Sequence, residues 1–352
     1  KANLTEMKQS DHEGETEMAD VANTDMKEFT LTHLTATDAL GRTLPEVTGY
    51  RNDKSVGVFY FLWHGQHNPG STVRNVTELL RTDYNDLFER NSSVVPEGSW
   101  LYINEPLYGY YNSEDEWVMR KHIELFIAAG VDFVMFDFTN GYFYSKPLRN
   151  FIEILREYKE AGWEVPKISF YLWINGNTLA HRLMKSIYML EEYKDLVYYT
   201  SSGKPLLVGS IVLDPRGVGE VLDNEVLDFF DCRQSAVEVQ SHERLWPYWQ
   251  FQRDWNVYID MVNISGAQAA AASSFAYECP EGWPAEQHGR GWSSSNPVNG
   301  DIEAIMRGDN IQEGWDNAIK RDPEIIFVCG WNELVTQKYY HPGGFVCYTD
   351  NF

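Results

Sequence analysis

Acidic and amide side chains stand at the ends of two long apolar runs in this sequence. Asp137 lies near the end of the run 131–138, and Asn332 and Glu333 directly follow the run 324–330. Two carboxyl groups that face each other across a cleft carry out acid and base chemistry, because one protonates a leaving oxygen while the other acts as base or nucleophile. We predict Glu333 and Asp137 as catalytic residues, with Glu105 as a further candidate. An ion-pairing or sugar-orienting role is the alternative for Asp137.

Aromatic residues make up 14% of the chain, with 12 Trp and 21 Tyr. Their rings combine a flat apolar face with a polar edge, which suits a sugar ring, although the same residues also fill large cores. Three tryptophans follow apolar runs, amide side chains both donate and accept hydrogen bonds, and the glycine-rich segment 288–292 carries an arginine. The predicted substrate-binding residues are Trp63, His64, Trp173, Asn175, Arg290, Trp331 and Asn332.

Two histidines, His64 and His67, are three residues apart and are potential metal ligands. A catalytic zinc site needs at least a third protein ligand, and the sequence supplies no obvious one. We therefore predict neither a metal nor another cofactor. A metal-dependent hydrolase remains the least favoured hypothesis.

Amphipathic segments alternate with apolar runs from residue 54 onwards. This pattern predicts helices at 113–130, 147–162, 178–193, 216–225 and 309–320, and strands at 56–63, 131–138, 167–173, 205–209, 227–232 and 324–330. Ser113, followed three residues later by Glu116, resembles a capping box for the first of these helices. Alternation of this kind requires a parallel sheet, and the segment 54–333 has the length of a (β/α)8 TIM barrel. A doubly wound open sheet is the alternative, but its GxGxxG fingerprint is absent after the first strand.

We predict a single-domain α/β protein with a polar N-terminal extension at 1–50 and the (β/α)8 barrel at 51–352. Residues 1–30 contain few large apolar side chains, so they cannot fold alone. The chain begins without Met, which indicates a mature or trimmed form. The segment after the last strand is short for a final barrel helix, so we expect further residues beyond it.

The net charge of −23 disfavours nucleic acid and anionic lipid surfaces as partners. The sequence contains no apolar run of about 20 residues that would span a membrane, and no signal peptide is visible. The four cysteines do not form a scaffold, although one bridge, such as Cys279 to Cys347, remains open. Four N-x-Ser/Thr sequons begin at Asn3, Asn75, Asn91 and Asn263.

Several short motifs together resemble glycoside hydrolase families seventy-one and ninety-nine, the α-glucanase and endo-α-mannosidase group. They are the strand start at 58–60 with Trp63, the segment from 115–117 to 130–137, the turn at 203–207, and the segment 330–333. The resemblance implies a (β/α)8 barrel that hydrolyses an α-linked glycan, with Glu333 as the first carboxylate of the family pattern. Where that pattern has a second carboxylate three residues later, this chain has Thr336. Asp137, Glu105 and Glu278 are the candidates for the missing role.

The sequence thus predicts a glycoside hydrolase that acts on an oligosaccharide or polysaccharide and is secreted, periplasmic or at the cell surface. The alternative is a non-catalytic glycan-binding barrel, because Thr336 interrupts the usual carboxylate pair. A second carboxylate about 5 to 10 Å from Glu333 would distinguish the two.

Overall fold

A computed structural model describes residues 35–38, 41–44, 53–82, 84–102, 105–213, 217–235, 245–246, 261–265, 291–298, 301–341 and 345–347. The chain divides into two compact units, Lys1–Val47 and Thr48–Phe352. The described part of the first unit contains an antiparallel ribbon of β1 (Ala36–Thr37) and β2 (Thr43–Leu44). All candidate site residues belong to the second unit.

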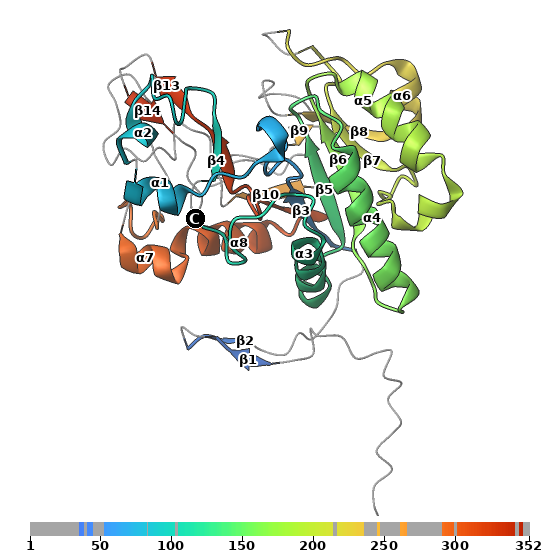
Figure 1. Cartoon of the computed structure of the whole chain (residues 1–352). Helices are drawn as coiled ribbons and strands as arrows, with labels where there is room; N and C mark the ends of the chain where they lie inside the picture. The colour runs from blue at the N-terminus through green and yellow to red at the C-terminus, as the bar shows by residue number, and fades with distance from the viewer. Residues whose placement is uncertain are drawn as a thin grey trace, which may run out of the picture. The chain divides into compact units, whose positions relative to one another are not determined.

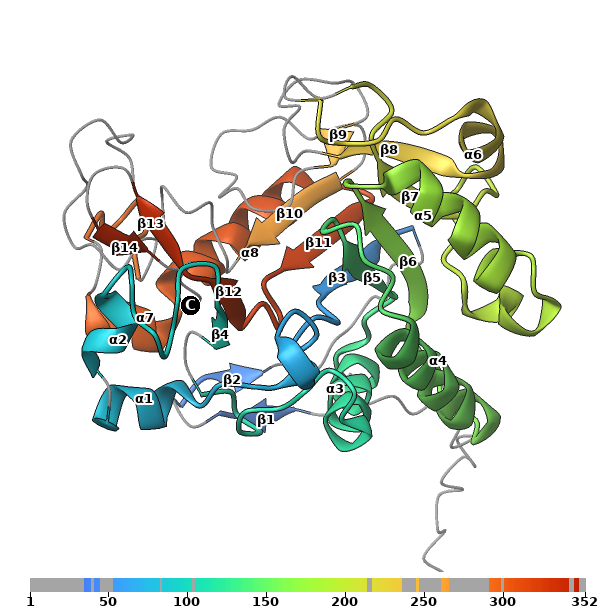
Figure 2. The same cartoon turned by 45° about the horizontal axis from the view of Figure 1, so that its top comes forward.

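The second unit is built on a parallel sheet of eight strands (Figures 1 and 2). In chain order these strands are β3 (Ser55–Tyr60), β5 (Phe133–Phe138), β6 (Lys167–Leu172), β7 (Leu206–Gly209), β8 (Asp231–Ser235), β9 (Leu245–Trp246), β10 (Met261–Ser265) and β11 (Ile325–Cys329). Their order in the sheet is β10-β11-β3-β5-β6-β7-β8-β9, so the last of these eight strands in the chain, β11, lies beside the first, β3. This neighbour relation is the one found in a (β/α)8 barrel. Figure 2 shows the strands curling around a common axis.

Helices connect the strands and cover the outer side of the sheet. The longer ones are α3 (Glu116–Ala129), α4 (Ser145–Glu160), α5 (Gly176–Leu183) and α8 (Asp309–Arg321). The shorter ones are η3 (Pro69–Ser71), α1 (Val76–Thr82), α2 (Tyr84–Phe88), the π-helical turn η4 (Met184–Tyr188), η5 (Glu191–Leu196), α6 (Asn224–Phe229) and α7 (Ile302–Arg307). None of the helices in the described ranges is long and apolar enough to cross a membrane.

Two small antiparallel pairs accompany the parallel sheet. β12 (Val335–Gln337) pairs with β4 (Trp100–Tyr102), and β13 (Tyr339–His341) pairs with β14 (Phe345–Cys347). Because β12 begins two residues after Glu333, its pairing with β4 fixes the segment that leaves the last parallel strand.

Side chains alternate between the two faces of each parallel strand. The ring centroid of Phe59 in β3 lies 5.5 Å from that of Phe327 in β11 and 5.3 Å from that of Tyr171 in β6. Because β6 is not a neighbour of β3 in the sheet, the contact with Tyr171 crosses the concave side. Phe59 therefore points to the inner, concave face. The next residue, Tyr60, contacts Phe126 of α3 and Phe151 of α4 and points outward.

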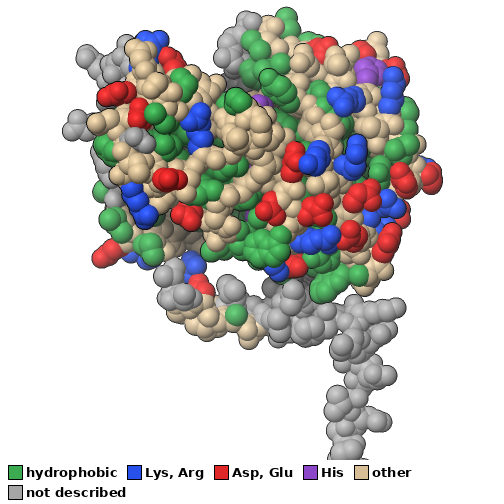
Figure 3. Space-filling model, in the orientation of Figure 1, with side chains coloured by type: hydrophobic (Ala, Val, Ile, Leu, Met, Phe, Trp, Pro, Cys, Tyr) green, Lys and Arg blue, Asp and Glu red, His purple; other side chains and the backbone are tan. Residues whose placement is uncertain are grey.

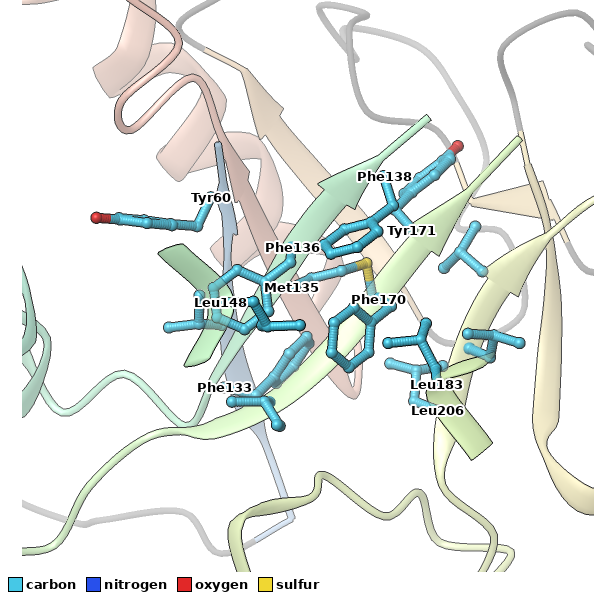
Figure 4. Close-up of a cluster of buried hydrophobic side chains, with 14 of the residues drawn as sticks. Tyr60, Phe133, Met135, Phe136, Phe138, Leu148, Phe170, Tyr171, Leu183 and Leu206 are labelled. Carbon is cyan, nitrogen blue, oxygen red and sulfur yellow. The ribbon is translucent and has the colours of Figure 1, made fainter. Parts of the chain in front are cut away.

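The outer face carries much of the aromatic core. Tyr60, Phe136, Phe138 and Phe170 are almost fully buried, and Figure 4 shows these rings with their neighbours. Each buried side chain of this size contributes about 1.5–3 kcal/mol to folding. The solvent side of α3 and α4 carries interleaved acidic and basic side chains, as Figure 3 shows, including the ion pair between Arg120 and Glu157.

The structure places four elements differently from the sequence prediction. Asp115, not Ser113, caps α3 by accepting hydrogen bonds from the backbone N–H groups of Trp117 and Val118, because the Ser113 hydroxyl is bonded to His64. The predicted helix 178–193 is divided into α5, η4 and η5. The predicted helix 216–225 and strand 227–232 are replaced by α6 and β8, which lie further along the chain.

Candidate active site

Asp137 lies in β5 on the inner face, because it is two residues beyond Met135, which is in register with Phe59. Its side chain is only 2% exposed, and its Oδ1 accepts a hydrogen bond of 2.9 Å from the backbone N–H of Thr139. Burial penalises the ionised form and raises the pKa of Asp137 to about 6, although the hydrogen bond acts in the opposite direction. A carboxyl group with this pKa is partly protonated near neutral pH and can donate a proton.

Glu333 follows β11 after a turn at Gly330, whose φ of 81° is a conformation that favours glycine. The Glu333 side chain is 5% exposed. Cys329 shares the inner face with Phe327, and the pKa of its thiol is raised by burial and by the negative charge of Glu333. The Glu333 carboxylate therefore lies near Cys329, toward the inner face.

β11 and β5 are the two neighbours of β3, so Glu333 and Asp137 belong to strands that flank the same strand. Two strand spacings correspond to roughly 10 Å between backbones at one level of a sheet. The two carboxylates therefore belong to segments on either side of β3, with Asp137 in β5 and Glu333 four residues beyond the end of β11.

A row of residues in register crosses the inner face from Asp137. Asp137 pairs with Tyr171, Tyr171 with Val208, and Val208 with Arg233 of β8. Residues paired in parallel register share a face, so Arg233 points inward at the level of Asp137. Arg233 is 5% exposed and forms an ion pair of 3.4 Å with Asp231.

Further buried polar residues extend this inner surface on the neighbouring strands. Asn263 and Ser265 of β10 are in register with Phe327 and Cys329, and Ser235 follows Arg233 by two residues. Neither these residues nor Arg233 were predicted as site residues. Strands are predicted from apolar runs, and β8 (Asp-Cys-Arg-Gln-Ser) has none.

Five aromatic side chains gather beside Asp137, and we call them the aromatic wall: Trp63, His67, Trp100, Tyr142 and Tyr144. Trp63 meets Trp100 edge-on at 4.7 Å, and His67 stacks on Trp100 at 4.6 Å. Burial and, after it, the charge of Asp137 raise the pKa of Tyr144, which links the wall to the carboxylate. Tyr142 is exposed, so the wall reaches solvent.

Trp63 is buried, and its indole Nε1–H has no hydrogen-bond acceptor within the described structure. An unsatisfied buried donor costs about 1–3 kcal/mol, so an acceptor on a ligand would stabilise the site. The sequence predicted Trp63 as a binding residue, but not the other members of the wall in this role.

Trp173 and Asn175 come just after the carboxyl end of β6. A Cβ on Gly219 would come within 2.7 Å of the Trp173 indole, so glycine allows the loop after β7 to pack against this ring. Asn175 is exposed, with a φ of 53°, and its Nδ2 donates to the carbonyl of Gly141 at 3.4 Å. Trp173 is half-buried, whereas Asn175 is exposed.

Asn332 has a structural role in place of the predicted substrate contact. Its Oδ1 accepts from the backbone N–H of Phe61, and its Nδ2 donates to the carbonyl of the same residue, both at 2.9 Å. The amide thus binds the end of β3 as a neighbouring strand would, and Asn332 is 1% exposed. This pairing holds the adjacent Glu333 at the end of the sheet.

His64 is fully buried and also braces the sheet. Its Nε2–H donates to the carbonyl of Asn332 at 2.7 Å, since a carbonyl can only accept, and Nδ1 therefore accepts from the Ser113 hydroxyl at 3.0 Å. Burial lowers the pKa of His64 to about 3, so the ring is neutral. With both nitrogens used, His64 cannot serve as the predicted substrate contact.

Three other predicted residues are not brought to this site. The Trp331 ring packs against Phe126 and His122 of α3, on the outer side of the sheet. Glu105 is exposed and accepts from the Thr77 hydroxyl of α1 at 3.2 Å. Arg290 lies outside the described residues, as do Glu278 and Cys279.

The metal hypothesis finds no support in the described part of the chain. His64 uses both ring nitrogens, and Nε2 of His67 hydrogen-bonds the Tyr144 hydroxyl at 3.0 Å. Within the described ranges, no group of three His, Cys, Asp or Glu side chains has the arrangement of a metal site.

No protein-family model and no curated protein matches the chain. Among solved structures, it is similar to the GH99 endo-α-mannosidase from Bacteroides thetaiotaomicron in complex with BIS-TRIS-propane, at 13% identity and a TM-score of 0.40, covering 80% of this chain and 84% of that one. A further structure of that enzyme gives the same identity and TM-score over 80% and 86%. A glycoside hydrolase-like protein matches at 13% identity and a TM-score of 0.33, over 92% and 82%. The function of this chain is therefore argued from its own residues.

Proposed function

We propose that the protein is a glycoside hydrolase in which Asp137 and Glu333 are the working carboxylates. The observation that carries this proposal is a pair of buried carboxyl groups, one on β5 and one in the segment that follows β11, beside an aromatic wall that reaches solvent. We further propose that β9 and β10 complete a closed eight-stranded barrel, since each lies at an open edge of the sheet.

Asp137 is assigned the role of general acid. Its raised pKa keeps a proton available for the leaving oxygen of a glycosidic bond. Glu333 acts from the opposite side of the bond as base or nucleophile. In such enzymes the two carboxyl groups lie about 5 to 9.5 Å apart, and side chains from segments on either side of β3 can span that range.

The aromatic wall provides a stacking surface for sugar rings. The Trp63 Nε1–H donor and the rim residues Trp173 and Asn175 supply hydrogen bonds and further contact area. This set favours an oligosaccharide or polysaccharide as substrate, and such a substrate is consistent with a secreted, periplasmic or cell-surface protein.

The test is the release of reducing sugar from a panel of plant, fungal and animal glycans by the wild type, Asp137→Asn and Glu333→Gln. Loss of a general acid lowers kcat by about 10²–10⁴-fold, and we expect comparable losses for both variants. Glu105→Gln is the matched control, because Glu105 is an exposed carboxylate away from the site, and it should retain full activity. Equal activity in wild type and both site variants would contradict the proposal.

The second candidate function is a glycan-binding barrel without catalysis. Thr336 favours it, because this residue is buried in β12, in register with Leu101 of β4, where the resembling families carry a carboxylate. Binding of glycans by the wild type without any cleavage across the panel would support this alternative.

A further inference from the structure

We propose that the protein has a second glycan-binding site on its outer surface, where Trp117 and Trp331 stack on the sugar rings of a neutral polysaccharide. This surface lies on the helix-covered side of the sheet, opposite the inner face that carries Asp137. Binding there needs no catalysis, so the inference goes beyond the proposed function and is tested separately from it.

Five aromatic side chains form one continuous cluster on and beside α3, and we call it the outer aromatic patch: Tyr108, Trp117, His122, Phe126 and Trp331. The ring centroid of Tyr108 lies 5.3 Å from that of Trp117 and 5.9 Å from that of His122. The ring centroid of Trp331 lies 6.2 Å from that of His122 and 5.0 Å from that of Phe126. His122 and Phe126 are buried, so they give the exposed rings a fixed base.

Both tryptophans of this patch present much of their surface to solvent. Trp117 is 56% exposed and Trp331 is 40% exposed, and Figure 3 shows hydrophobic side chains gathered on the surface over α3. Within the described ranges, the indole N–H of neither tryptophan forms a hydrogen bond, and neither of these atoms is buried. Each indole therefore offers a flat apolar face and a donor, which match the apolar face and the hydroxyl groups of a sugar.

The size of the exposed surface favours a sugar chain over a second copy of the protein. Together, the exposed parts of the two indoles amount to on the order of 250 Å². A stable interface between proteins buries about 800 Å² on each partner. Because the rings already rest on buried neighbours, binding costs little side-chain entropy, and a small contact area is enough for a few sugar rings.

The charges that border the patch favour a neutral glycan. The ammonium group of Lys121 lies 5.8 Å from the ring centroid of Trp117 and forms an ion pair of 2.7 Å with Glu124. The charge beside the ring is therefore compensated, and an acidic polymer gains no net attraction from it. Both exposed side chains can still exchange hydrogen bonds with sugar hydroxyl groups.

Electrophoresis in native gels that contain α-mannan, soluble starch, a β-1,3-glucan or xylan measures binding without catalysis. The protein carries Asp137→Asn, so that the polymer stays intact. We expect at least one of these polymers to retard the protein, and Trp117→Ala to weaken that affinity about tenfold. Trp163→Ala is the matched control, because Trp163 is 50% exposed and packs on Tyr158, at 6.5 Å between ring centroids, away from the patch. It should bind as tightly as the parent.

Two further substitutions test whether the contact is ring stacking. Trp117→Phe keeps an aromatic face and should retain most of the affinity, whereas Trp117→Leu keeps only an apolar surface and should lose it as Trp117→Ala does. Equal affinity in the Phe and Leu variants would contradict stacking. Thermal unfolding should give each variant nearly the Tm of the parent, because more than half of the Trp117 side chain is exposed.

The outcomes separate this inference from the proposed function. Retardation that depends on Trp117 supports the inference even if the wild type cleaves no polymer, which would defeat only the proposed function. Unchanged retardation in Trp117→Ala, or no retardation by any of the four polymers, overturns the inference, and cleavage by the wild type then leaves the proposed hydrolase standing. A dimer in sedimentation experiments that dissociates in Trp117→Ala would also overturn it, because a second copy would then occupy the patch.

Discussion

The proposed role of Asp137 as a general acid depends on the burial of its carboxyl group. A carboxyl group in water is ionised at neutral pH, whereas the pKa of Asp137 is raised from 3.8 to about 6 because the inner face removes water from it. Its hydrogen bond from the backbone of Thr139 limits this rise, so the group can still ionise within the physiological range. Loss and uptake of a proton are both possible there, as a general acid requires.

If Asp137 is the general acid, kcat should fall as the pH rises through about 6, because the ionised form has no proton to donate. The measurement is kcat against pH from 4 to 9 on whichever glycan the enzyme cleaves. We expect a decline of about tenfold per pH unit above this pKa. Asp137→Glu, whose carboxyl group reaches further toward solvent, should move the decline to lower pH, and an unchanged profile in that variant would exclude Asp137 as its source.

Single residues also explain why His64 and Asn332 were misjudged from sequence. Both follow apolar runs, where ligand-binding residues of a barrel also occur. Only the structure shows that the Asn332 side chain hydrogen-bonds the backbone of Phe61. It also shows that His64 hydrogen-bonds the Ser113 hydroxyl and the backbone carbonyl of Asn332. Residue type and spacing predicted that these positions matter, but not whether they face a ligand or another strand.

At the scale of elements, strands β3, β5, β6, β7 and β11 were predictable because both of their faces are largely apolar. β8 was misplaced for a physical reason. Asp223 caps a short helix, α6, whose apolar residues look like a strand, while the strand itself is polar because it lines the inner face. Arg233 was missed as a consequence, so the error fell on a strand that contributes to the candidate site.

The segment after Glu333 is held by an unusual lysine. Lys338 is 1% exposed, and its Nζ donates to the backbone carbonyls of Asp86, Glu89 and Val95 at 2.6–2.8 Å. A buried ammonium with three acceptors joins the end of α2 and the following loop to the chain beyond β12. This contact stabilises the strand pairing that leads away from the site.

Lys338→Met should lower the free energy of unfolding by about 3 kcal/mol, because three backbone carbonyls, at least one of them buried, lose a charged donor. Urea denaturation measures the change, and Lys320→Met, at an exposed position in α8, should alter stability by less than about 0.5 kcal/mol. A loss for Lys338→Met as small as that of the control would mean that water replaces the ammonium without cost.

For the whole molecule, the alternation of apolar and amphipathic segments predicted an α/β fold with a parallel sheet, and this is confirmed. The polar lining of the sheet was not predictable, since it depends on register between strands that are far apart in sequence. Two buried histidines, His64 and His122, also lie in the packed interior. Burial lowers the pKa of His64 from 6.5 to about 3 and that of His122 to about 4.

These shifts tie the stability of the fold to pH. Between about 4 and 6.5 the unfolded chain binds protons at His64 and His122 that the folded chain does not, so both residues make stability fall as the pH drops through this window. Asp137 acts in the opposite direction between 3.8 and about 6, because the folded state binds its proton more tightly.

His122→Gln isolates one histidine, because the amide can keep the hydrogen bond that Nδ1 of His122 makes with the Tyr60 hydroxyl at 2.9 Å. In this variant, unfolding is no longer accompanied by uptake of a proton at position 122. The slope of its unfolding free energy against pH should therefore be smaller than that of the wild type by up to about 1.4 kcal/mol per pH unit between pH 4 and 6.5. Urea denaturation at half-unit intervals measures both slopes, and Lys185→Gln, at an exposed position in η4, serves as the control. Parallel curves for His122→Gln and wild type would show that His122 is charged in the folded protein.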